Sequence, residues 1–348
     1  MIIMEKYFLG TYTKRNLSHG IYTFDFDPDH QVASNLKLFA EAGDPFYLTN
    51  GPDNLLYSID YNRHTDKPGG IKALSKEFES PTVKYSVYDA TASGTYIDYD
   101  AENQLVFTAN YDINEISIYS TRNNKFTLLD RTHDVGQLGP EPEQADGPHP
   151  HFINYTPDHR LVVCDLGIDT ILTYNITNDY KFELVATLKM PAGFGPRHLR
   201  FNHDQNIAYA VGELSSDLAT LKYDPKLGQF SIVDIISTIP ANWHTHNGAA
   251  AIRISADNRF VYVSNRGYNS VVVYKIAANG SVEQIQNVHT NGDFPWDIQF
   301  SKSEQSLLVA NQRSNSLSVF QRNTENGKLK LLNSDFMIPE PLAILRTE

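Results

Sequence analysis

The chain has 348 residues and a formal net charge of −12, and 41% of its residues are hydrophobic. The acidic balance argues against nucleic acids and anionic membranes as partners, because both attract basic patches. With one cysteine, Cys164, the chain can form no internal disulfide, and the apolar run around it predicts a buried thiol on a strand. No run is long and apolar enough for a membrane span, and residues 1–6 lack the apolar core of a secretory signal. We therefore expect a cytoplasmic protein.

A repeated pattern organises the chain. Each unit starts with an apolar anchor residue, continues through a turn with Asp or Asn, and ends in further strand-like segments. The anchors are separated by 46 to 56 residues, a period typical of β-propeller blades built from several short strands. The seven anchors are Leu48, Ile97, Ile153, Leu199, Ile252, Ile298 and Ile344. They predict one all-β domain over residues 1–348, a seven-bladed propeller with four-stranded blades.

The N-terminal blade is predicted to lack its first strand. The segment Tyr7–Thr11 resembles a second strand of the repeat, and Gly20–Phe24 and Leu36–Phe39 follow as the third and fourth strands. The last anchor, Ile344, marks a strand that is free to fill the missing place. We expect the two ends of the chain to pair and close the ring, which removes the exposed sheet edges.

Two long connections interrupt the repeat. Residues 132–150 precede blade four and are rich in Gly, Pro and acidic residues, and Ile239–Gly248 precedes blade six. Long loops on a rigid scaffold often border sites, although a tolerated surface insertion fits residues 132–150 equally well. The pairs Asn279-Gly280 and Asn326-Gly327 predict tight hairpin turns between outer strands.

Blade five brings opposite charges together. Gly195–Phe201 and Tyr209–Glu213 read as two strands joined by a turn at residues 202–206. Arg197 lies just before the first strand and Glu213 at the end of the second, so antiparallel pairing places both at one edge.

Aligning the repeats enlarges this cluster. The position two residues before the anchor holds His151 in blade four and Arg197 in blade five, and the position fourteen residues after it holds Glu213 and Arg266 in blades five and six. Both positions belong to one face of the ring, near its axis. A structural repeat has no packing reason to place His and Arg at equivalent positions, so these departures indicate a site. We predict all four as catalytic; the alternatives are a backbone hydrogen bond for His151 and a purely structural ion pair between Arg197 and Glu213.

Weaker candidates for substrate contacts lie on the same face: His149, His198, His246 and Trp296. The histidines fit equally well as solvated residues of the rim, and Trp296 as a plug that packs the channel. No metal motif is present, because the close histidine pairs 149/151 and 244/246 lack a third ligand at a familiar spacing. We therefore expect no metal and no cofactor.

Three segments resemble a known family. Gly195-Pro196-Arg197-His198, Pro148-His149-Pro150-His151 and Tyr262-Val263-Ser264-Asn265-Arg266 are similar to the lactonase family of seven-bladed propellers. That family includes propeller-type 6-phosphogluconolactonases and the fungal carboxy-cis,cis-muconate cyclase. The resemblance implies an active site of one His, two Arg and one Glu, which by motif fall on His151 (with His149 as its rival), Arg197, Arg266 and Glu213. Trp296 departs from the family pattern, in which an arginine follows the proline at this position. This chain therefore has one cation fewer there.

The resemblance implies hydrolysis of a sugar lactone, most readily 6-phosphoglucono-1,5-lactone of the pentose phosphate pathway. In this interpretation His151 activates water, one arginine stabilises the oxyanion and the other binds an anionic group of the substrate. A lactone-forming cyclase or isomerase of the muconate type would use similar residues, and many propellers are non-catalytic binding scaffolds. The sequence leaves the oligomeric state open.

Overall fold

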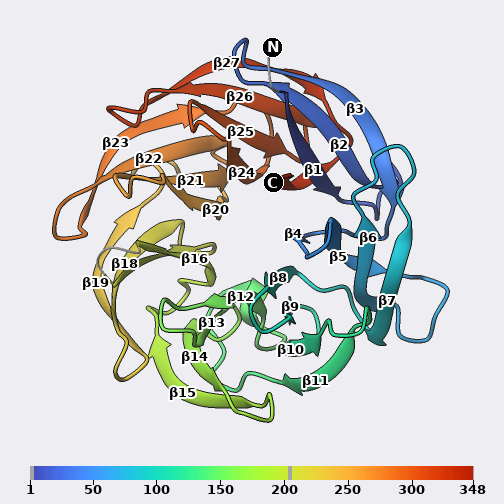
Figure 1. The fold of residues 1–348 in the computed structure, drawn as a ribbon. Coiled ribbons are helices and arrows are strands. Elements are labelled where there is room, and N and C mark those ends of the chain that lie inside the picture. The colour runs from blue at the N-terminus through green and yellow to red at the C-terminus, as the bar shows by residue number, and fades with distance from the viewer. Residues whose placement is uncertain (1–3, 203–205, 348) are drawn as a thin grey trace.

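A computed structural model describes residues 4–202 and 206–347. These residues form a ring of seven four-stranded antiparallel sheets around a central axis (Figure 1). Regular structure in the described ranges is all strand except for one short 3-10 helix, Pro142–Gln144. The predicted seven-bladed all-β propeller is therefore confirmed, while the turn expected at residues 202–206 falls mostly outside the described residues. No helix within the described ranges is long and apolar enough to cross a membrane.

Each blade runs from an innermost strand to an outermost strand. In that order, blade one consists of β28 (Pro341–Arg346), β1 (Glu5–Thr11), β2 (Gly20–Asp27) and β3 (Val32–Glu41), and blade two of β4 (Leu48–Asn50), β5 (Leu55–Tyr61), β6 (Gly69–Ser75) and β7 (Val83–Ala90). Blade three consists of β8 (Tyr96–Asp100), β9 (Leu105–Asn110), β10 (Glu115–Ser120) and β11 (Thr127–Thr132), and blade four of β12 (Pro150–Tyr155), β13 (Leu161–Asp165), β14 (Thr170–Ile176) and β15 (Phe182–Lys189). Blade five consists of β16 (Pro196–Asn202), β17 (Ile207–Gly212), β18 (Asp217–Asp224) and β19 (Gln229–Ser237), blade six of β20 (Gly248–Ile254), β21 (Phe260–Arg266), β22 (Ser270–Ile276) and β23 (Val282–His289), and blade seven of β24 (Pro295–Phe300), β25 (Ser306–Asn311), β26 (Ser316–Arg322) and β27 (Leu329–Met337).

The repeated anchors form the hydrophobic core between blades. All seven are at most 5% exposed, and each sits on an innermost strand. Full burial of an aliphatic side chain stabilises the fold by about 1.5–3 kcal/mol, so the anchors fix the innermost strands relative to one another. Cys164 is also buried, as a free thiol on β13.

The two chain ends close the ring. β28 pairs with β1 in antiparallel register, with Leu9 opposite Ile344 and Phe8 opposite Leu345. Beyond the strand, the Thr347 backbone N–H donates to the Lys6 carbonyl at 3.0 Å. The C-terminal strand thus becomes the innermost strand of blade one, as predicted.

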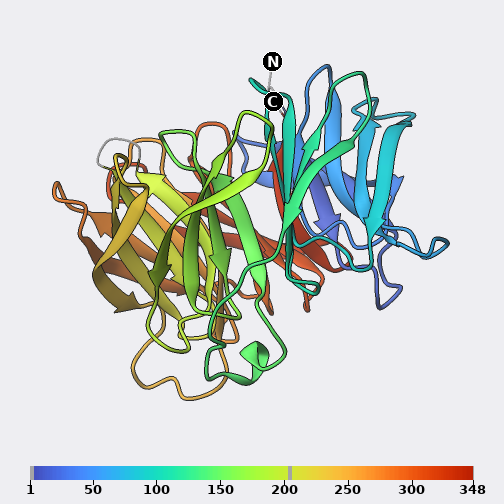
Figure 2. The same cartoon turned by 90° about the horizontal axis from the view of Figure 1, so that it is seen from below.

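The two faces of the ring differ. The long connections before β12 and β20 both extend from the same face, seen along the lower edge in Figure 2. Innermost strands begin on this face and their neighbouring strands end on it, because adjacent strands are antiparallel. Loop residues that flank both strand ends can therefore converge near the axis on this face.

Candidate active site

The four residues predicted as catalytic come from three adjacent blades. His151 is the second residue of β12 and Arg197 the second residue of β16, so Arg197 lies inside its strand and not just before it. Glu213 directly follows β17, and Arg266 is the last residue of β21. All four lie on the face with the long connections, at the strand ends that meet near the axis of the ring.

Glu213 joins the two arginines. Its Oε2 lies 2.9 Å from Nε of Arg197, and its Oε1 lies 2.7 Å from Nη2 of Arg266. Burial disfavours the charge on Glu213, but Arg266 and Arg197 outweigh it and hold the pKa of Glu213 below its ordinary value. The carboxylate is therefore ionised at neutral pH and carries no proton to donate.

Arg197 is the deepest member of the cluster. Its side chain is fully buried, and its Nη1 donates to the Ala250 carbonyl at 2.9 Å. Burial and the neighbouring Arg266 lower the pKa of Arg197 to about 10, which still leaves it charged at neutral pH. Its Nη2 has no hydrogen-bond partner among the described residues. A buried, charged donor without a partner is costly, and such groups mark sites where a ligand supplies the acceptor.

Trp296 covers the two arginines. The guanidinium carbons of Arg197 and Arg266 lie 5.3 Å and 4.9 Å from the centroids of its indole rings, within cation–π range. The indole Nε1 is buried and also lacks a hydrogen-bond partner within the described ranges. Trp296 is partly exposed, so the structure places an aromatic wall and a free N–H donor beside Arg197.

His151 is a buried, neutral base beside this cation pair. Its side chain is 6% exposed, and its Nδ1 accepts or donates no hydrogen bond in the part of the chain that the structure describes. Burial, together with Arg197 and Arg266, lowers the pKa of His151 well below its ordinary value. A neutral imidazole with a free nitrogen can accept a proton from a bound water.

His149 is held in place by its neighbours. Its ring stacks on that of Tyr111 at a centroid distance of 4.0 Å, and Nδ1 lies 2.9 Å from the Tyr111 carbonyl. Its Nε2 lies 2.9 Å from a carboxylate oxygen of Asp146. Both ring nitrogens of His149 are therefore engaged, whereas no hydrogen bond joins a ring nitrogen of His151 to a described residue.

His198 lies beneath the cluster. It is fully buried, and its ring packs edge-on against Tyr47 and Tyr96 at 5.6 Å and 5.5 Å. Its Nε2 lies 3.2 Å from Nη1 of Arg197, and burial lowers the pKa of His198 well below its ordinary value. A neutral His198 can accept a hydrogen bond from Arg197, so its position suits support of that arginine better than contact with a substrate.

His246 stands apart from the other candidates. It is exposed on the loop that precedes β20, and no hydrogen bond, ion pair or ring contact joins its side chain to a described residue. The structure therefore brings together seven of the eight predicted site residues and leaves His246 on the rim.

The loop before Arg197 is fixed by Asp169. Its Oδ1 accepts from the backbone N–H of Gly195 and its Oδ2 from that of Gly193, each at 2.8 Å. Gly195 has φ +58, and a Cβ there would lie 2.5 Å from Leu214, so this turn requires glycine. Oδ1 also accepts from Nε2 of Gln144 in the long connection before β12. The buried Asp169 carboxylate thus links the long connection before β12 to the turn that positions Arg197.

Sequence reasoning missed two aromatic residues of the site. Tyr111 occupies the same repeat position as Glu213 and stacks on His149, and burial and Glu213 raise its pKa. Phe294 lies 5.1 Å from the guanidinium carbon of Arg266. The repeat position could have identified Tyr111, but Phe294 lies in a loop whose conformation no spacing predicts.

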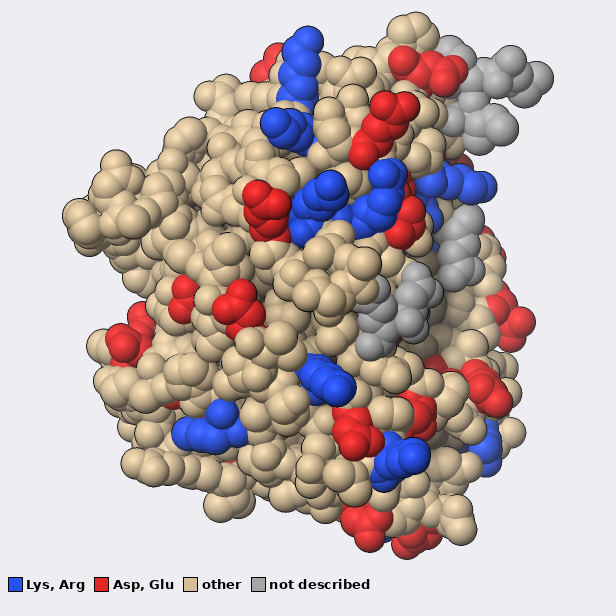
Figure 3. All heavy atoms as spheres, turned by 90° about the vertical axis from the view of Figure 1, so that its left-hand side faces the viewer, with Lys and Arg blue, Asp and Glu red and all other residues tan. Residues whose placement is uncertain are grey.

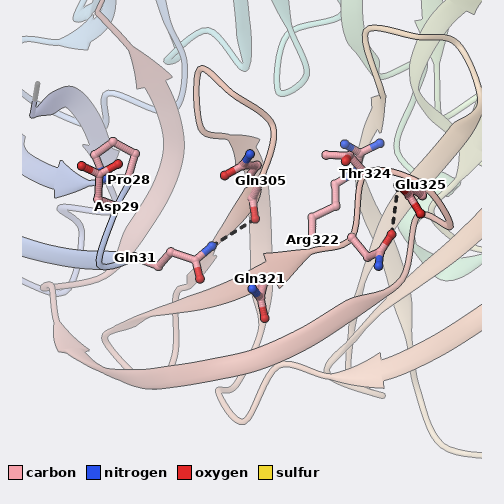
Figure 4. A pocket seen from close by; sticks show the side chains of 9 residues that line it. Pro28, Asp29, Gln31, Gln305, Gln321, Arg322, Thr324 and Glu325 are labelled. Carbon is pink, nitrogen blue, oxygen red and sulfur yellow. Dashed lines mark hydrogen bonds between the residues drawn. The ribbon is translucent and has the colours of Figure 1, made fainter.

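A pocket of about 560 Å³ lies elsewhere, between blades seven and one (Figure 4). It is lined by residues 28, 29, 31, 305 and 321–325, at or near the connections on the opposite face. Figure 4 shows side chains spread along the groove, with Gln31 donating to the Gln305 carbonyl at 3.1 Å. Its buried cation, Arg322, is held by the Tyr262 hydroxyl at 2.7 Å. Since these side chains do not converge on one point, the axial cluster is the better candidate for the active site than this pocket.

The axial cluster can bind and polarise an anion or a carbonyl oxygen. It offers two guanidinium groups, an indole N–H and a neutral imidazole around one face of the ring. Among the described residues, no group of three or more His, Cys, Asp or Glu side chains is arranged to hold a metal ion. The imidazole offers acid–base chemistry, and the guanidinium and indole donors offer electrostatic stabilisation.

Comparison with known proteins identifies the family. The family model described as "Lactonase, 7-bladed beta-propeller" matches residues 6–346. A 6-phosphogluconolactonase of Bacillus subtilis (strain 168) is 33% identical over 349 residues, covering 98% of each chain. The crystal structure of a protein from Lactobacillus plantarum has a TM-score of 0.95 at 39% identity and covers 99% of this chain and 100% of that chain. The periplasmic gluconolactonase of Pseudomonas aeruginosa has a TM-score of 0.90 at 25% identity, with 99% of each chain covered. This chain belongs to the lactonase family of seven-bladed β-propellers.

Proposed function

We propose that the protein hydrolyses 6-phosphoglucono-1,5-lactone to 6-phosphogluconate in the cytoplasm, a step of the pentose phosphate pathway, without a metal or cofactor. Membership of the lactonase family supports lactone hydrolysis, and a relative named 6-phosphogluconolactonase supports the choice of substrate. The observation that carries the proposal is the position of a neutral histidine with a free Nδ1, His151, beside the Arg197–Glu213–Arg266 cluster.

His151 moves the proton. Its neutral imidazole takes a proton from the attacking water as the new C–O bond forms at the lactone carbonyl. The resulting imidazolium then gives that proton to the ring oxygen as the C–O bond of the ester breaks. The ionised Glu213 is poorly suited to this donation, because Arg266 and Arg197 keep its pKa low.

Arg197 stabilises the transition state. Its unpartnered Nη2 can donate to the oxyanion that develops on the carbonyl oxygen, and Nε1 of Trp296 is a second free donor nearby. Donors of this kind contribute about 3–4 kcal/mol when they are fixed before the reaction. Glu213 and the Ala250 carbonyl fix Arg197, so little reorganisation is needed when charge develops.

The test is an assay on a panel of phosphorylated and unphosphorylated lactones, with release of acid followed in a pH-stat. Hydrolysis in H₂¹⁸O should place one ¹⁸O in the product carboxylate, whereas a cyclase or isomerase would incorporate none. Activity should survive dialysis against EDTA. A protein that hydrolyses no lactone but binds one without turnover would favour the scaffold alternative, and recovery of lost activity by a divalent ion would overturn the metal-free mechanism.

A further inference from the structure

Cationic and aromatic side chains alternate from the rim of the ring to the buried cluster. The guanidinium carbon of Arg313 lies 3.9 Å from the centroid of Phe294, and that of Arg266 lies 5.1 Å from the same ring. Trp296 then separates Arg266 from Arg197, at 4.9 Å and 5.3 Å. We call these five side chains the cation–aromatic column. It begins at the exposed Arg313 and ends at the fully buried Arg197.

The column carries more positive than negative charge. Of its three guanidinium groups, Arg197 and Arg266 share Glu213. No carboxylate of a described residue lies within ion-pair distance of Arg313. On the side of the ring shown in Figure 3, acidic and basic side chains are interspersed, and the chain as a whole carries −12. An uncompensated cation at the mouth of the cluster is therefore a local device for attracting an anion.

The backbone holds this arrangement under strain. Phe294 has φ +65, a left-handed conformation that is unfavourable for a bulky aromatic residue. Its N–H donates to Oδ1 of Asn269 at 2.9 Å, and its carbonyl accepts from the Gln312 N–H at 3.0 Å. Surroundings that impose such a conformation often do so at a functional site, because the strain fixes a side chain in a needed position. Here the fixed ring is the one that orients Arg313.

The dimensions suit a phosphorylated sugar lactone. The guanidinium carbons of Arg313 and Arg266 are separated by no more than the sum of their distances to Phe294, about 9 Å. A sugar phosphate whose lactone ring lies against Arg266 can therefore reach toward Arg313 with its phosphate. An arginine fork that is free of carboxylates is well suited to a phosphate monoester.

We propose that Arg313, oriented by Phe294, binds the phosphate of the substrate and makes the enzyme selective for phosphorylated over unphosphorylated aldonolactones. The proposal rests on the lactonase function proposed above.

The matched control is Arg63. Arg63 and Arg313 each follow the second strand of their blade by two residues, on the same face, and both are exposed. Arg63 belongs to blade two and Arg313 to blade seven, and only Arg313 is part of the cation–aromatic column. Replacement of Arg313 by Gln should raise KM for the phosphorylated lactone by about ten- to a hundred-fold, the loss expected for a charge-assisted hydrogen-bonded pair. In Arg313→Gln, KM for the unphosphorylated lactone and kcat for both lactones should stay within about two-fold of the wild-type values. Arg63→Gln should change KM and kcat for neither lactone.

Calorimetric titration with 6-phosphogluconate and with gluconate separates the two proposals. If the wild-type protein hydrolyses no lactone, the proposed function fails, but tighter binding of 6-phosphogluconate that is lost in Arg313→Gln and kept in Arg63→Gln still supports the phosphate site. If the wild-type protein is active but Arg313→Gln affects both lactones equally, or Arg63→Gln matches its effect, the phosphate site is wrong. Partial recovery of selectivity in Arg313→Lys would further support an electrostatic contact.

Discussion

At the scale of single residues, the proposed hydrolysis depends most directly on His151. Replacement by alanine removes the proposed base and should lower kcat by about two to four orders of magnitude. His149→Ala should lower it much less, because both nitrogens of His149 are already occupied by Tyr111 and Asp146. Steady-state kinetics of the two variants measure this difference, and the reverse ranking would assign the base to His149.

The pH dependence should reflect the charges around His151. A general base must be neutral, and burial with Arg197 and Arg266 lowers the pKa of His151 below the ordinary value of about 6.5. Activity should therefore stay constant as pH falls through 6.5 and decline only at more acidic pH. Arg266→Gln removes one of these positive charges and should move the acidic limb of kcat/KM to higher pH. A limb above pH 6.5 in the wild-type enzyme would contradict this assignment.

Arg197 and Arg266 are expected to act at different stages. Arg197 is fully buried with a free Nη2, so Arg197→Lys should reduce kcat with little change in KM, which is typical of a contact made in the transition state. Arg266 lies between Trp296 and Phe294, and Arg266→Lys should raise KM more for an anionic lactone than for its neutral analogue. Thermal melts must show that both variants remain folded. A pure binding defect in Arg197→Lys would reject the division.

The sequence could locate much of the cluster because its residues break a repeat. His151 and Arg197 share one repeat position and Glu213 and Arg266 another, so strand register alone brings the four to one face. Phe294 and Arg313 could not be found in this way. Their contact depends on the left-handed backbone at Phe294, which is set by hydrogen bonds from distant residues and not by any local pattern.

At the scale of elements, the innermost strand β16 needs the turn before it to position Arg197. Asp169 accepts backbone hydrogen bonds from Gly193 and Gly195, and Asp169→Ala leaves both donors buried and unpaired. We expect a loss of about 1–3 kcal/mol in the free energy of unfolding, together with a lower kcat because Arg197 is no longer fixed. Chemical denaturation and kinetics test both effects.

A suitable control for the turn is Asp179→Ala. Asp179 is exposed and accepts a hydrogen bond from the hydroxyl of Thr177. The Asp179→Ala substitution should change the free energy of unfolding by less than about 0.5 kcal/mol and leave kcat unchanged. If Asp169→Ala behaves in the same way, the proposed link between this turn and the function of Arg197 is wrong.

At the scale of the whole molecule, the ring geometry decides what the sequence can reveal. Each blade repeats one anchor at a buried position, so seven anchors predict seven blades and the place of the missing strand. The same geometry brings loops of different blades together at the axis, where each loop has its own sequence and conformation. The repeat therefore predicts the scaffold well, and it predicts the site only where a side chain sits on a strand end.

Closure of the ring by β28 gives the last prediction. Leu342 and Ile344 are 0% and 2% exposed, and burying each contributes about 1.5–3 kcal/mol, so deleting residues 341–348 should cost several kcal/mol and lower the melting temperature sharply. Removing only residues 347–348 leaves the β28 ladder intact and should cost far less. A synthetic peptide of residues 341–348 should bind the truncated protein and raise its melting temperature, because it restores the pairing with β1. A truncated protein that melts like the full chain, or one that the peptide does not stabilise, would show that the ring does not depend on this strand.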